Sequence, residues 1–185
     1  MAADFKGQFV LGDGKTCFPL TITDSYSRML LRCQGLASTT ERGSPSMKQQ
    51  TLTILKPDTV ARRNVGAIIS RLEQDGFEIL GARRLLLAEE QAKAFYAVHS
   101  ERPFYRSLVE FMTSGPVWVM ALERDNAVEH LRKVMGATDS TKAEKGTIRA
   151  KFGTNIERNA IHGSDSPENA RIEISFFFSA SDLLG

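Results

Sequence analysis

Residues 47–185 predict an α+β fold in which helices pack on one face of a sheet. Three observations point to this class. Apolar residues recur with strand and helix periods in turn along the segment, Pro and Gly separate the periods, and 42% of the 185 residues are hydrophobic. A segment of this size can bury a sizeable core, so we expect one globular domain after an N-terminal extension.

The first half of this segment predicts two strands around one helix. TLTILK, residues 51–56, has the composition of a strand, and Pro57 with Asp58 closes it. A helix is predicted next, because four apolar residues share one helical face: Val65, Ile68, Ile69 and Leu72. Gly76 ends it. FEILGARRLLL, residues 77–87, is the second expected strand.

Two short helices come next and form an inserted pair. Helical spacing runs through EEQAKAFYAVH, residues 89–99, and again through RPFYRSLVEFM, residues 102–112, with a break before Pro103. PVWVMALE, residues 116–123, is the third strand, and DNAVEHLRKVMG, residues 125–136, is a further helix.

The end of the chain predicts a loop, a strand and a helix. ATDSTKAEKG, residues 137–146, is a polar loop, and a short fourth strand lies near Ala160 and Ile161. The last helix starts at Pro167, with Ser166 as its N-cap. The order β-α-β-β-α-β with an inserted helical pair is the ferredoxin-like layout, an α/β sandwich with a four-stranded antiparallel sheet.

The extension, residues 1–46, differs from the domain, residues 47–185. LASTTERGSPS, residues 36–46, has the composition of a linker, and GQFVLGDGKTCFPLTITD, residues 7–24, could hold two short strands. Nothing in the extension builds an obvious apolar face, so we expect it to be poorly ordered and irrelevant to activity. Met47 is a plausible second start.

One motif in the extension imitates a nucleotide site. Residues 12–16, GDGKT, resemble the end of a phosphate-binding loop. The full pattern needs a glycine where Phe9 stands, and it needs a helix where the following residues favour extended chain. We therefore expect no nucleotide there.

Charge and cysteine content exclude several classes of protein. The 24 Lys and Arg nearly balance the 22 Asp and Glu, so the net charge of +2 gives no broad basic field and no reason to expect a specific nucleic-acid partner. Cys17 and Cys33 are compatible with a reducing cytosol, and no apolar run approaches the ~20 residues of a membrane span. We expect a cytoplasmic protein with no membrane partner, while the acid-free MLLRCQGLAST from Met29 leaves organelle targeting open.

His162 stands where a strand ends and a helix is about to begin, next to Gly163. An imidazole held there is exposed and rigid enough to attack an electrophile, and Glu173, about two turns into the helix, could orient the ring. A lone histidine in a turn more often only closes the turn, so this pattern alone is weak.

Three cations strengthen the case for phosphate chemistry. Lys56, Arg132 and Arg149 could converge on one edge of the sheet, although each taken singly is more often solvated surface. Phosphoryl transfer needs such convergence, because its transition state spreads negative charge over the transferred oxygens.

Six motifs together resemble one family, nucleoside diphosphate kinase, from about Met47 to Phe178: TLTILKPD, FYAVHSERPFY, FMTSGPV, MGATD, GTIRAKFG and NAIHGSDS. The resemblance implies transfer of the γ-phosphoryl group of a nucleoside triphosphate, typically ATP, to a nucleoside diphosphate through a phosphohistidine at His162. It implies that Glu173 and Ser164 hold the histidine and its phosphate. Mg²⁺ would bridge the nucleotide phosphates and need few protein ligands, so no dedicated metal residues are expected.

The resemblance also implies a nucleotide-binding set, of which Phe104 is the base-stacking member. An aromatic face accepts every base, which fits a kinase with little base preference. Ordinary helix core is the other interpretation of Phe104 and Tyr96. His99 is expected near the phosphates, and His130 is expected to be solvated. The remaining expected positions are Lys56 and Tyr96, which also serve catalysis, with Arg102, Arg132, Thr138, Arg149 and Asn159.

Two departures from the family pattern bear on assembly rather than chemistry. Lys151 stands where relatives usually carry an acid, and Asp139-Ser140 stands where Asn-Pro is common. The family forms homo-oligomers, and a sheet with one uncovered face gives subunits a reason to pair, so a tetramer or hexamer is expected. Two rival functions remain: a nucleic-acid module, although the third strand offers only Trp118 for stacking, and a catalytically silent interaction protein.

Overall fold

The computed structural model describes residues 2–5, 9–10, 16–23, 30–36 and 48–183, and the chain divides into two units, Met1–Met47 and Lys48–Gly185. In the first unit, β3 pairs antiparallel with each of the other three strands. The strands of this unit are β1 (Ala2–Phe5), β2 (Phe9–Val10), β3 (Thr16–Thr23) and β4 (Leu30–Leu36).

Only some of the predictions for the extension concern residues that the structure describes. Strands β2 and β3 occupy the stretch for which two strands were predicted, and β3 begins at Thr16, so strand rather than helix follows the GDGKT motif. Residues 12–15 of that motif and linker residues 37–46 lie outside the described residues. Poor order of the extension stays a prediction.

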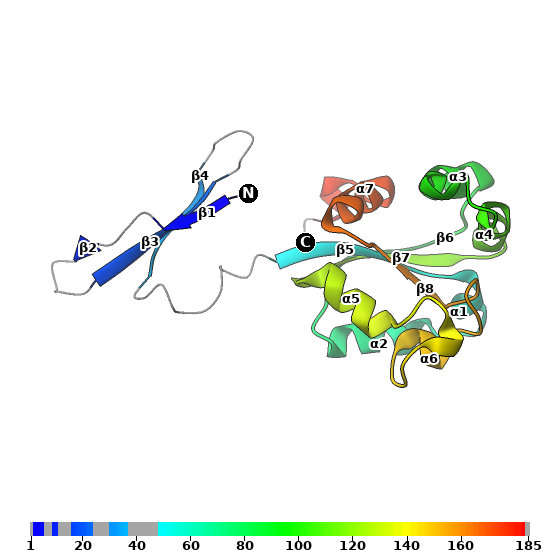
Figure 1. The fold of residues 1–185 in the computed structure, drawn as a ribbon. Helices are drawn as coiled ribbons and strands as arrows, with labels where there is room; N and C mark the ends of the chain where they lie inside the picture. The colour runs from blue at the N-terminus through cyan, green and yellow to red at the C-terminus, as the bar shows by residue number, and fades with distance from the viewer. Residues whose placement is uncertain (1, 6–8, 11–15, 24–29, 37–47, 184–185) are drawn as a thin grey trace. The chain divides into compact units, whose positions relative to one another are not determined.

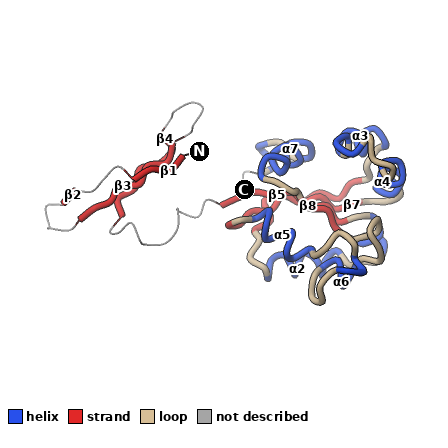
Figure 2. Tube along the Cα trace, in the orientation of Figure 1, coloured by secondary structure: helices blue, strands red, loops and turns tan. Residues whose placement is uncertain are grey.

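The second unit contains a four-stranded antiparallel sheet in the order β6-β7-β5-β8 (Figures 1 and 2). This confirms the predicted ferredoxin-like α+β class. The central strand β5 pairs with β8 so that Ile54 lies opposite His162. The strands are β5 (Lys48–Leu55), β6 (Glu78–Leu85), β7 (Val117–Asp125) and β8 (Ile161–Gly163).

Within the described part of this unit, residues 48–183, seven α-helices surround the sheet: α1 (Pro57–Ala61), α2 (Val65–Gln74), α3 (Glu89–Phe95), α4 (Tyr105–Thr113), α5 (Ala127–Met135), α6 (Ile148–Phe152) and α7 (Pro167–Phe177). Short 3₁₀ turns span Ala97–His99, Ser140–Lys142 and Ala180–Asp182. Helices α1 and α6 were not predicted. Among the residues described, no helix is long and apolar enough to cross a membrane.

Helices cover both faces of the sheet, so the expected packing on one face is wrong. Because side chains alternate along a strand, Leu52 and Ile54 pack with α3, α4 and α7 in one apolar cluster, whereas Met120 and Leu122 pack with α2 and α5 in another. In Figure 1, α3, α4 and α7 lie on one side of the sheet and α2, α5 and α6 on the other. The inserted helical pair and the last helix fill the face that the sequence left open.

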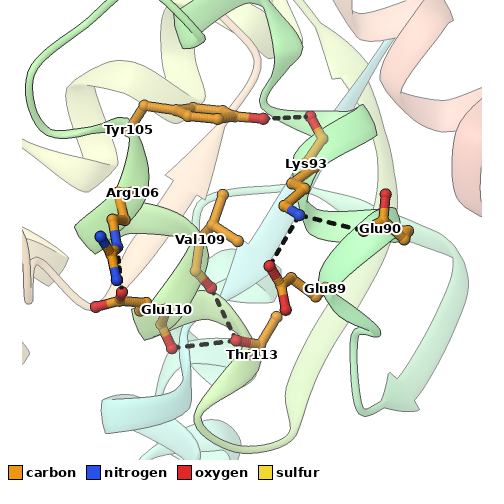
Figure 3. Close-up of polar contacts among 8 residues, drawn as sticks. All are labelled: Glu89, Glu90, Lys93, Tyr105, Arg106, Val109, Glu110 and Thr113. Atoms are coloured by element: carbon orange, nitrogen blue, oxygen red, sulfur yellow. Dashed lines mark hydrogen bonds and ion pairs between the residues drawn. The ribbon is translucent and has the colours of Figure 1, made fainter.

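The inserted pair, α3 and α4, is joined by a hydrogen bond from a side chain to the backbone, which Figure 3 shows. The Tyr105 hydroxyl donates to the carbonyl oxygen of Lys93 at 3.1 Å. The Lys93 ammonium in turn lies 2.8 Å from Glu89 and 3.2 Å from Glu90, and these exposed pairs within α3 contribute little to stability. We call α3, α4 and the turn between them, residues 96–104, the hairpin; the Tyr96 ring in this turn lies 6.1 Å from the ring of His162 in β8.

Candidate active site

The strand that carries His162 is preceded by a residue in the left-handed backbone region. Ala160 has φ of 67°, which is uncommon for a residue other than glycine. Its carbonyl oxygen accepts two hydrogen bonds, from the Lys56 backbone N–H at 2.9 Å and from the Thr59 hydroxyl at 2.8 Å. These bonds hold the turn, so β8 begins in a fixed direction and delivers His162 to the edge of the sheet.

His162, Glu173 and Ser164 form a connected group. The imidazole Nε2 lies 3.1 Å from Glu173 Oε1, and the Ser164 hydroxyl donates to Glu173 Oε2 at 2.6 Å. The Ser164 oxygen accepts the Leu52 backbone N–H at 3.1 Å, which anchors it to β5. Helix α7, capped by Ser166, carries the glutamate. The structure thus brings His162 together with the two residues that were predicted to hold it.

Two buried cations lie near the start of β8, the strand that carries His162. Lys56 and Arg149 are each only 7% exposed. Arg149 donates from Nη1 to the Gly136 carbonyl and from Nη2 to the Ile161 carbonyl, both at 3.0 Å, and its Nε has no partner among the described residues. Burial, helped by Arg132, lowers the pKa of Arg149 to about 10, so it stays charged at neutral pH.

Lys56 is held by fewer contacts. Its Nζ donates to the Glu157 carbonyl at 3.3 Å and lies 5.9 Å from the centre of the Phe111 ring. Burial, and next the charge of Arg149, lowers the pKa of Lys56 to about 8, while Asp58 and Glu157 oppose this shift. The charged form of Lys56 is therefore only partly compensated in the folded protein, and an anionic ligand would stabilise it.

Asn159 ties two loops together beside these cations. Its Nδ2 donates to the carbonyl oxygens of Thr138 and Ile156, each at 3.0 Å. Its Oδ1 is buried without a partner in the part of the chain described. Such an oxygen is costly unless a ligand donor reaches it.

A cavity of about 430 Å³ unites three further predicted residues. Arg132, Thr138 and Arg149 line it together with Lys133 and Lys142. An anion with several charged oxygens fits this lining, because four cations surround the space and Glu144 is the sole acid in its wall. His162, Lys56 and the α3–α4 hairpin do not line this cavity, so it accounts for only part of the expected set.

The hairpin supplies the remaining predicted residues. Phe104 is 46% exposed, with its ring 5.8 Å from that of His99, and Arg102 is also exposed. Tyr96 is buried, with its ring 6.1 Å from that of His162. Burial, and next the charge of Glu173, raises the pKa of Tyr96. Phe104 is thus not helix core, whereas Tyr96 both belongs to the core and faces the histidine.

Other features were missed or misjudged from sequence. Phe95 lies 5.5 Å from the His162 ring, ring centre to ring centre, and only its place beside Tyr96 could have indicated this. His130, which was expected to be solvated, is only partly exposed, because its ring packs on Phe77 and its Nε2 is buried. In the segments that the structure describes, no group of three His, Cys, Asp or Glu side chains is arranged to hold a metal ion.

Comparison with known proteins agrees with this geometry. The family model for nucleoside diphosphate kinase matches residues 49–183. The chain is 56% identical over 137 residues to the nucleoside diphosphate kinase of Helicobacter pylori strain Shi470, covering 74% of this chain and 100% of that protein. It is 56% identical over 135 residues to the enzyme of Wolinella succinogenes, covering 73% and 98%.

Solved structures give the same result. The Aquifex aeolicus nucleoside diphosphate kinase superposes with a TM-score of 0.73 at 45% identity, covering 75% of this chain and 100% of that one. A Halobacterium salinarum nucleoside diphosphate kinase in complex with CDP superposes with a TM-score of 0.72 at 39% identity, covering 75% and 93%. The chain therefore belongs to the nucleoside diphosphate kinase family and is an enzyme that transfers phosphate between nucleotides.

Proposed function

We propose that the enzyme moves the γ-phosphoryl group of a nucleoside triphosphate, typically ATP, to a nucleoside diphosphate in two steps through a phosphohistidine at His162. The observation that carries this proposal is the contact of Nε2 with Glu173, because it leaves Nδ1 as the ring nitrogen that can attack. Glu173 also supports the positive charge that the ring gains on phosphorylation.

In the first step the Nδ1 lone pair forms a bond to the γ-phosphorus, the bond to the β,γ-bridging oxygen breaks, and a nucleoside diphosphate leaves. In the second step a β-phosphate oxygen of the acceptor attacks the phosphorus, the P–N bond breaks, and neutral His162 is restored. Ser164 donates to Glu173, so it keeps the carboxylate aligned with the ring through both steps.

The other predicted residues bind the nucleotide in this proposal. Arg149 and Lys56 are fixed, buried charges that stabilise the transferred oxygens without reorganising. Asn159 and Lys56 reach the sugar hydroxyls, and the unpartnered Oδ1 of Asn159 suits a hydroxyl donor. Phe104 stacks on the base, and Tyr96 packs beside the reacting ring. Arg102, Arg132 and Thr138 hold the phosphates.

Family membership implies a divalent cation, and we propose Mg²⁺. Among the described residues no cluster of three His, Cys, Asp or Glu side chains could hold a metal ion. An ion carried by the substrate needs no such cluster, because Mg²⁺ commonly keeps its waters and binds through substrate phosphates with few protein ligands. When bound, it neutralises charge on the phosphates. The chain's own part would be to hold Lys56 and Arg149 as cations that bind the phosphate oxygens.

Domain roles, assembly and compartment also stay proposals. We assign catalysis to residues 47–185 and expect a protein that begins at Met47 to keep full turnover. A homo-oligomer, tetramer or hexamer, now rests on the family resemblance alone, since both sheet faces are covered by helices. A cytoplasmic location without membrane or specific nucleic-acid partners remains an expectation from composition.

The decisive experiment is incubation with γ-labelled ATP and Mg²⁺, followed by an alkaline quench, which phosphohistidine survives. The wild type should carry label that leaves on addition of any nucleoside diphosphate. His162→Ala should carry none, and His130→Ala, which changes a histidine on the other face, should label normally. An unlabelled wild type that still binds ATP would contradict the proposal and favour a silent nucleotide-binding protein.

A further inference from the structure

An aromatic cluster formed by Phe95, Tyr96, Phe176 and Phe177 lies against one side of His162. Phe95 is its centre, with ring centres 4.9 Å from Tyr96, 5.1 Å from Phe177 and 5.5 Å from Phe176. The Phe95 ring is also 5.5 Å from the His162 ring, at an interplanar angle of 75°. Phe95 ends α3, and the two other phenylalanines end α7, so the cluster joins the two helices beside the reacting ring.

The contact with Glu173 does not by itself stop the imidazole of His162 from rotating about the line that joins its Cγ to Nε2. The ring is attached to the main chain through Cγ and is held by Glu173 at Nε2, on the far side of the ring. These two points define a line about which the ring can turn, and that turn carries Nδ1 out of position. An in-line attack tolerates little such error, so something else must restrict the rotation.

The Phe95 ring meets the condition that this rotation sets. It stands nearly perpendicular to the imidazole, in the edge-to-face arrangement that aromatic pairs prefer, so rotation of either ring loses the contact. Phe95 is itself held by three other rings of the cluster and cannot simply follow. The described ring pairs of Phe176, by contrast, are with Phe95 and Phe177, so Phe176 acts at one remove.

We propose that Phe95 is a positioning residue for the histidine: its ring fixes the rotation of the imidazole and thereby keeps Nδ1 directed at the phosphoryl group. This inference rests on the phosphohistidine mechanism proposed above. It assigns to the aromatic cluster a part in the rate of the reaction beyond the packing of α3 on α7.

The test compares three variants by the single-turnover rate of His162 labelling and by the KM for nucleotide. Phe95→Ala should slow labelling about 10- to 100-fold, because a misplacement of ~1 Å can reduce a rate by ~10²-fold. Phe95→Leu keeps most of the volume without the ring, so it should slow labelling about 2- to 12-fold. KM should stay within about twofold in both, since the ring contacts of Phe95 are with aromatic side chains and His162, and none of these is proposed to hold the base, the sugar or the phosphates.

Phe176→Ala is the matched control, because it removes a half-exposed ring from the same cluster. Its labelling rate should stay within about threefold of the wild type, as for a surface change. Wild-type rates in Phe95→Leu, or equal losses in Phe95→Ala and Phe176→Ala, would overturn the inference, and Phe95→Leu decides alone if the alanine variant fails to fold. An unlabelled wild type would overturn the phosphohistidine proposal itself. If the wild type is labelled and the Phe95 variants label at the same rate, only the inference about Phe95 fails and the phosphohistidine proposal stands.

Discussion

The residues proposed to bind the nucleotide separate into a buried half and an exposed half. The buried half is Lys56, Arg149 and Asn159, and the exposed half is Arg102, Phe104, Arg132 and Thr138. The side chains of the buried half already donate to backbone carbonyl oxygens from three stretches of chain: Gly136 and Thr138, Ile156 and Glu157, and Ile161. The exposed half belongs to the hairpin and to the rim of the cavity.

This difference indicates which part of the substrate each half meets. Fixed charges stabilise a transition state best when they need no reorganisation, and this requires burial and firm hydrogen bonds. A base that varies from substrate to substrate is better met by an exposed ring that any π-face can stack on. We infer that the buried half sets the rate and that the exposed half sets the affinity.

The largest expected effect comes from Arg149→Ala. The change leaves the carbonyl oxygens of Gly136 and Ile161 unpartnered, each costing ~1–3 kcal/mol of unfolding free energy, and it should lower kcat about 10²- to 10³-fold. Denaturant unfolding and steady-state kinetics measure the two losses. Arg83→Ala, a partly exposed arginine paired with Asp182, is the control and should change kcat little. Equal kcat values for Arg149→Ala and Arg83→Ala would dissolve the distinction between the halves.

Arg149 also shows where prediction from the sequence ends. The alternating strand and helix periods predicted the four strands of the domain and five of its helices, because apolar spacing over several turns is a strong signal. Helix α6, which carries Arg149, is five residues long and has no such period. Its N-cap Thr147, whose hydroxyl accepts the Ala150 N–H, was the only local sign.

The candidate site was predicted through motif resemblance more than through geometry. Sequence spacing suggested that Glu173 could reach His162, and the structure places them 3.1 Å apart. Nothing local could show that the Ser164 hydroxyl is anchored by the Leu52 N–H, since the two residues are brought together by strand pairing. The same holds for Phe95, whose contact with the histidine depends on how α3 packs against α7.

The second prediction sets function against stability at Lys56. Because burial lowers its pKa to about 8 from 10.5, the unfolded chain holds this proton more tightly than the folded protein does. Lys56→Met should therefore raise the unfolding free energy at pH 7 while lowering kcat/KM about 10²-fold. The stability gap between the two proteins should be full below pH 8 and should close as the pH rises toward 10.5.

Thermal melts at several pH values, with kinetics alongside, measure this trade. In the wild type, kcat/KM should also decline above pH 8 as Lys56 loses its charge, and Lys56→Met should not share that decline. A methionine variant less stable than the wild type at pH 7 would show that the buried ammonium is already well satisfied without substrate.

The third prediction concerns Phe104 in the exposed half. Phe104→Ala should raise the KM for every nucleotide about 5- to 150-fold, since a stacked base contributes ~1–3 kcal/mol. Because the ring is 46% exposed, stability should change by no more than ~0.5 kcal/mol. Phe104→Tyr keeps the face and should keep the KM. A fall in kcat with unchanged KM would place Phe104 with the rate-setting half instead.

The smallest effect is expected at Lys151, where the family resemblance predicted an acid. Its side chain is exposed, and its ammonium lies 5.1 Å from the centre of the neighbouring Phe152 ring, a contact worth ~0.5–1 kcal/mol at such a site. Lys151→Asp should therefore lower the unfolding free energy by at most ~1 kcal/mol and leave kcat and KM unchanged. Lys151→Gln is the control, because it removes the cation without adding an anion. Arg149 lies two residues earlier on the same short helix, yet its side chain is buried. If Lys151→Asp lowered kcat, burial would no longer mark the residues that set the rate, because an exposed charge on α6 would act on the reaction as strongly as a buried one.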